Sequence, residues 1–102
     1  MYKMVVAVIR HSLLEKVAAG LKQAGVHFTY SEVKGFGEEV RLYHEDIHDR
    51  IKIEIIADEK NIGEVKRIVG SDVPHGTAGS GIMAVMHIDE FTDFSHEKDG
   101  GS

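Results

Sequence analysis

Ile51-Lys52-Ile53-Glu54-Ile55-Ile56 is the stretch that decides the fold, because apolar and polar side chains alternate along it. Successive side chains of a strand point to opposite faces, so this alternation predicts a strand with one face in a core. Upstream, Met4-Val5-Val6-Ala7-Val8-Ile9 is continuously apolar and rich in β-branched residues. Such a run favours a strand that is covered on both faces. The core is therefore expected to form on a sheet.

A helix is predicted between these two strands. Ser12 and Glu15 have the spacing of a capping box, and the apolar residues of 13–24 then recur at helical intervals. Gly25 is well placed to end the helix, since glycine readily adopts the left-handed conformation of a helix terminus. Gly20 lies inside the helix, where glycine is unfavourable, and indicates a close approach of another backbone.

The remaining elements follow from composition and spacing. Residues 27–33 have the aromatic and β-branched composition of a strand, and residues 38–50 are highly charged and are predicted to form an exposed loop. Asp58 can cap a second helix that ends at Gly70, and 82–88 is a last apolar strand.

The order strand, helix, strand, strand, helix, strand predicts an α+β domain of the ferredoxin-like βαββαβ type. Right-handed crossovers place both helices on one face of a four-stranded antiparallel sheet. The first and last strands nevertheless carry apolar residues on both faces, so copies of the chain are expected to cover the other face. Residues 1–95 are assigned to this domain, and residues 96–102 to a polar, flexible tail.

Composition narrows the function. The chain has 102 residues, a formal net charge of −5 and no cysteine, so thiolate metal sites and cysteine nucleophiles are excluded. Nucleic acids and anionic membranes attract basic patches, so neither is an expected partner. The longest apolar run, 4–9, is too short for insertion into a membrane, and a cytoplasmic location is expected.

Three segments resemble the nitrogen regulatory protein PII family, in the order in which that family has them. Ser31-Glu32-Val33-Lys34-Gly35-Phe36-Gly37 is similar to the end of the family's second strand. Lys52-Ile53-Glu54-Ile55-Ile56 resembles its third strand, and Gly76-Thr77-Ala78-Gly79-Ser80-Gly81 resembles its glycine-rich B-loop. The resemblance covers residues 4–88.

This resemblance implies a homotrimer that binds adenine nucleotides in clefts between subunits and regulates a transporter or an enzyme through its T-loop. It implies a signalling protein with no catalytic residues. The ligand-binding positions that it implies are Thr29, Gly35, Phe36, Gly37, Glu54, Ile56, Gly79, Ser80 and Gly81. The glycines among them allow backbone amides to approach phosphate oxygens.

The chain departs from the family at the phosphate ligands. Ser80 and Ile82 replace the usual B-loop aspartate and lysine, and Thr92, Asp93 and Ser95 stand where the family has arginines. A triphosphate loses most of its charge-assisted hydrogen bonds at such a site. The expected effector is therefore an adenine nucleotide of the series AMP, ADP and ATP, or another small anion. Among the nucleotides, one with fewer phosphates than ATP is favoured.

The seven histidines raise an alternative. His44 and His48 are four residues apart, and on a helical turn they would share a face that can chelate a transition metal. The chain would then be a metal-binding trimer similar to CutA proteins, with His75 or His87 as further candidates. The competing interpretation is that these histidines bind no metal. His44 and His48 would then lie in a solvated acidic loop, and the side chain of His87 would face the barrel of the trimer or a subunit interface.

Overall fold

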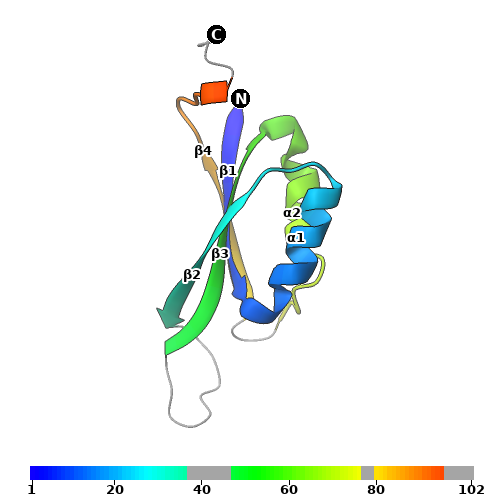
Figure 1. Ribbon diagram of the computed structural model, residues 1–102, viewed down its shortest axis with the longest axis vertical. Helices are drawn as coiled ribbons and strands as arrows, with labels where there is room; N and C mark the ends of the chain where they lie inside the picture. Colours follow the sequence, from blue (N-terminus) through cyan, green and yellow to red (C-terminus); the bar gives the residue numbers. More distant parts are fainter. Residues whose placement is uncertain (37–46, 77–79, 96–102) are drawn as a thin grey trace.

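The protein, described here as a computed structural model over residues 1–36, 47–76 and 80–95, has a four-stranded sheet with two helices on one face (Figure 1). Its elements are β1 (Tyr2–Arg10), α1 (Leu14–Gln23), β2 (Thr29–Phe36), β3 (Ile47–Asp58), α2 (Ile62–Gly70) and β4 (Gly81–His87). The strand order is β2-β3-β1-β4, and every neighbouring pair is antiparallel. The predicted ferredoxin-like fold is confirmed.

The core lies between the sheet and the helices. In β3, Ile51, Ile53 and Ile55 are buried and the residues between them are not, which confirms the alternation. The same face of β1 and the inner faces of the helices complete the core with Val5, Ala7, Ile9, Val17, Leu21, Ile62, Val65, Ile68 and Val69. Burying one such side chain stabilises the fold by about 1.5–3 kcal/mol, so this face holds the domain together.

The opposite face of the sheet is not covered within the described chain, and we call it the open face. The strand register assigns to it every second residue of each strand: Met4, Val6 and Val8 of β1, Ile82, Ala84 and Met86 of β4, Lys52, Glu54 and Ile56 of β3, and Thr29, Ser31 and Val33 of β2. Its β1 and β4 half is apolar, and Ile82 is 72% exposed. This is the uncovered apolar surface that the sequence predicted.

The helix ends follow the prediction at three of four places, and α2 ends at Gly70 as predicted. The amides of Gly25 and Val26 donate to carbonyls of the last turn of α1, and Gly25 has a φ of +73°, as a glycine terminus requires. Asp58 Oδ1 accepts from the Lys60 amide at 3.1 Å and caps the 3₁₀ turn η2 (Glu59–Asn61), which leads into α2. The prediction of a capping box at Ser12 is wrong. The chain passes from β1 directly into the 3₁₀ turn η1 (His11–Leu13), and α1 begins at Leu14 without a side-chain cap.

Gly20 marks the contact between the two helices. A Cβ at this position would lie 2.9 Å from Cγ2 of Ile68 in α2. The predicted close approach is therefore real, but it is made by a side chain and not by a second backbone.

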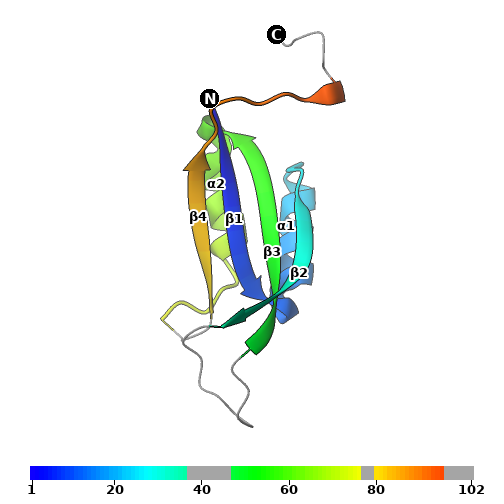
Figure 2. The same cartoon turned by 90° about the vertical axis from the view of Figure 1, so that its left-hand side faces the viewer.

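The predicted loop over 38–50 is partly wrong. β3 begins at Ile47, and its first residues pair with the end of β2 from Phe36↔Ile47 to Val33↔Arg50. This two-stranded ribbon extends past the helices (Figures 1 and 2). No core lies beneath it there, so an apolar alternation is not required and the segment resembles a loop in sequence. None of the described helices is long and apolar enough to span a membrane.

Candidate functional site

Four of the predicted ligand positions lie on the open face of β2 and β3. Thr29 pairs with Glu54, and Ile56 is the next residue of β3 on the same face. Gly35 pairs with His48 at the other end of β2. All four face the open side of the sheet, so β2 and β3 present one continuous strip with a hydroxyl, a carboxylate and an apolar side chain near Thr29.

Two further positions, Ser80 and Gly81, lie at the start of β4. Gly81 has a φ of +133°, and a Cβ there would lie 2.6 Å from the carbonyl oxygen of Val8, so only glycine fits. Ser80 is 7% exposed and its hydroxyl donates to the carbonyl oxygen of Pro74 at 2.5 Å. That hydroxyl is therefore bonded to the backbone of the turn that follows α2.

One chain does not bring these two groups together. β2 and β4 are opposite edges of the sheet with β3 and β1 between them (Figure 2). Phe36 ends β2 opposite Ile47 and is 71% exposed, so it belongs to the β2 edge. Gly37, Gly79 and His44 lie outside the described residues. Each chain thus carries two half-sites, one at each edge.

Two arginines that the sequence interpretation missed lie beside the β2–β3 strip. Arg10 at the end of β1 pairs with Arg50 of β3, and both are partly buried on the open side. Partial burial, and then the charge of Arg10, lower the pKa of Arg50 below its ordinary value. Arg50 also donates from Nη1 to the carbonyl oxygen of Asp49 at 2.7 Å. Two like charges held side by side favour an anion between or near them.

An ion pair crosses the ribbon on its other face. Lys34 Nζ donates to Asp49 Oδ1 at 2.6 Å between paired residues of β2 and β3. The hydrogen bond from Lys34, followed by the charge of Lys34, lowers the pKa of Asp49, and His11 and His48 contribute smaller effects in the same direction. Both side chains are exposed, so solvent screens the pair and it orders the ribbon more than it stabilises the fold.

We expect the change Lys34→Met to raise the pKa of Asp49 toward its ordinary value, because the donor and its charge are both removed. A carboxylate with a depressed folded-state pKa stabilises the fold above its unfolded pKa and loses that contribution as pH falls through the folded value. The stability difference between wild type and variant should therefore shrink in acid. Titration of carboxyl ¹³C shifts measures the pKa, with Glu64 as internal reference because its partner Arg67 is unchanged.

The structure does not place the predicted metal-binding pair of His44 and His48, because His44 lies outside the described residues. His48 belongs to β3, so the helical turn that would align the two is not present at His48. In the described ranges no group of three or more His, Cys, Asp or Glu side chains could hold a metal ion.

The two other histidines have separate environments. His87 pairs with Lys3 on the helix-bearing side of the sheet and lies 3.7 Å from Asp89, so it does not lie on the open face; its predicted place at the barrel or a subunit interface stays a prediction. His75 Nε2 lies 3.3 Å from the carbonyl oxygen of Gly70.

Comparison with known proteins agrees with the fold. Residues 2–98 match the family described as nitrogen regulatory protein P-II. Among curated proteins, the chain is 31% identical to nitrogen regulatory protein P-II 2 of Methanothermobacter thermautotrophicus over 97 residues, which cover 86% of this chain and 84% of that protein. It is 26% identical to P-II 1 of the same organism over 93 residues, covering 82% and 81% of the two chains. The chain belongs to the nitrogen regulatory protein P-II family.

Proposed function

We infer that the protein is a P-II-type regulator that assembles as a homotrimer and binds a small anionic effector in clefts between subunits. It is not an enzyme. It acts in the cytoplasm on a transporter or an enzyme, which it contacts through the residues that join β2 to β3.

The observation that carries this proposal is the division of the candidate site between the two edges of one sheet. Thr29 and Glu54 lie at the β2 edge, whereas Ser80 and Gly81 lie at the β4 edge. A second copy whose β4 edge meets the β2 edge of the first joins the two halves. The apolar half of the open face gives such copies a reason to associate, since burying it removes apolar surface from water.

The chemistry of the half-sites supports an anion with few phosphates. Gly81 has no side chain at the start of β4, and Arg10 and Arg50 supply positive charge on the open face, where Arg50 pairs with Val33, two residues before Gly35. Ser80 and Ile82 add no cation at the β4 edge. Residues 88–95, the described part of the segment after β4, contain no Lys or Arg, and Asp93 accepts hydrogen bonds there from the amide and the hydroxyl of Ser95. AMP or ADP suits this charge pattern better than ATP.

Isothermal titration calorimetry with AMP, ADP, ATP and cyclic AMP tests the proposal. We expect saturable binding with one site per chain and tighter binding of AMP or ADP than of ATP. The change Arg50→Gln should weaken binding about tenfold or more, because a hydrogen bond to a charged group contributes about 1.5–3 kcal/mol. Arg67→Gln is the matched control: Arg67 pairs with Glu64 on α2 and should not affect binding.

Absence of binding to well-folded trimer for all four nucleotides would overturn the effector class. Equal weakening by Arg50→Gln and Arg67→Gln would instead show that only the general charge of the protein matters.

A further inference from the structure

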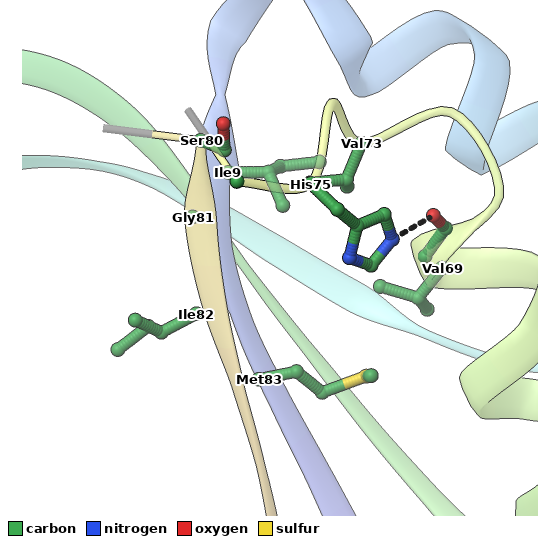
Figure 3. A pocket seen from close by; sticks show the side chains of 10 residues that line it. Ile9, Val69, Val73, His75, Ser80, Gly81, Ile82 and Met83 are labelled. Atoms are coloured by element: carbon green, nitrogen blue, oxygen red, sulfur yellow. Dashed lines mark hydrogen bonds between the residues drawn. The ribbon is translucent and has the colours of Figure 1, made fainter. Parts of the chain in front are cut away.

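A cavity of about 220 Å³ lies behind the start of β4, on the helix-bearing side of the sheet. The end of α2, the turn that follows it, the first residues of β4 and Ile9 of β1 line it, and it opens to solvent on one side (Figure 3). It shares Ser80 and Gly81 with the β4 half-site and includes none of the residues of the β2 half-site. Apolar protein cavities of about 150 Å³ bind benzene, so this one has room for a molecule of roughly six to ten heavy atoms.

The walls of the cavity are mainly apolar. Val69 and Ile9 are fully buried, and Val73 and Met83 line the sides. The lining within the described chain contains no Lys, Arg, Asp or Glu. A charged ligand would lose its hydration without gaining a counter-ion, so the cavity favours a neutral molecule.

His75 gives the cavity one specific polar group. Its Nε2 lies 3.3 Å from the Gly70 carbonyl oxygen, which can only accept, so the neutral ring carries its proton on Nε2. Nδ1 is then a hydrogen-bond acceptor, and it points away from Gly70 toward the space between α2 and β4 (Figure 3). The Ser80 hydroxyl is already donated to Pro74 and does not compete as a donor for Nδ1.

We propose that this cavity is a second ligand site, which binds a small neutral molecule with an aromatic or branched apolar body and one hydrogen-bond donor. The donor reaches Nδ1 of His75, and the apolar body contacts Ile9, Val69 and Met83. Because Ser80 and Gly81 line the cavity and also form the β4 half-site, an occupant alters the position of that half-site. This coupling rests on the proposed function, whereas the binding itself does not.

Methyl NMR of the full-length protein at pH 8, without nucleotide, tests the site with phenol and toluene as probes. They have nearly the same size, but only phenol has a donor. We expect saturable shifts for methyl groups of Ile9, Val69, Val73 and Met83, with a phenol dissociation constant on the order of 1 mM. The change His75→Phe keeps a planar ring but removes the acceptor. It should weaken phenol binding about fivefold and leave toluene binding unchanged.

His87→Phe is the matched control, because His87 lies at the other end of β4 and should alter neither probe. The proposal is overturned if the cavity methyls do not shift saturably, or if His75→Phe weakens both probes equally. Contacts in isotope-filtered spectra between these methyls and a side chain of a second copy would also overturn it, since the cavity would then be part of the subunit interface. A change in nucleotide affinity on adding phenol supports the coupling separately from the binding.

Discussion

Replacing Gly81 with alanine should destabilise the protein by about 3 kcal/mol or more, because two unfavourable terms add at one residue. The φ of +133° is a conformation that L side chains rarely adopt, and the added Cβ would lie 2.6 Å from the carbonyl oxygen of Val8. That oxygen is backbone in the middle of the sheet, so it cannot move without disturbing the pairing of β1 with β4. In thermal unfolding at fixed protein concentration, the midpoint should fall by at least about 10 °C.

Gly63→Ala is the matched control for this prediction. Gly63 lies in α2, and no atom comes within 4 Å of a Cβ built on it. Alanine is favoured over glycine in a helix, so this variant should be more stable than wild type by about 0.5–1 kcal/mol. Similar unfolding midpoints for Gly81→Ala and wild type would show that the start of β4 is looser than its geometry indicates.

The sequence predicted the parts of the fold that rest on a core. The alternation in β3 and the apolar spacing in α2 are direct consequences of burial on one face, so both could be recognised without the structure. Beyond the core the same reasoning failed. Ile47 to Arg50 has no helix to pack against, so its sequence carries no burial signal, and the predicted loop concealed a strand.

That error also hid part of the candidate site. Arg10 and Arg50 are 40 positions apart in the chain, and only the β1–β3 register places them side by side. Recognising Ile47 as the start of a strand antiparallel to β1 would have revealed the pair. The separation of Thr29 and Glu54 from Ser80 and Gly81 likewise depends on strand order, which the motifs themselves do not specify.

The second large effect is expected on assembly. Ala84 is exposed in the single chain and pairs with Val6 in the middle of the apolar half of the open face. In a trimer built on this face, Ala84→Glu would bury an unpaired carboxylate in each subunit, which costs several kcal/mol per charge. Because the residue is exposed in the monomer, the fold itself should tolerate the change. Sedimentation velocity should find wild type at three times the chain mass of 11.3 kDa and the variant at the chain mass.

Ala19→Glu provides the control, since Ala19 is exposed on α1 and the same charge is added on the helix-bearing side. It should remain trimeric and show the same helical circular dichroism as wild type. If Ala84→Glu also remains trimeric, the open face is not the interface, and the two half-sites must be joined by another arrangement of subunits. If Ala84→Glu is monomeric and also loses effector binding while its circular dichroism is unchanged, then assembly itself completes the site. We expect this loss of effector binding in the monomer, because β3 and β1 separate the β2 edge from the β4 edge within one chain and the two half-sites meet only between chains.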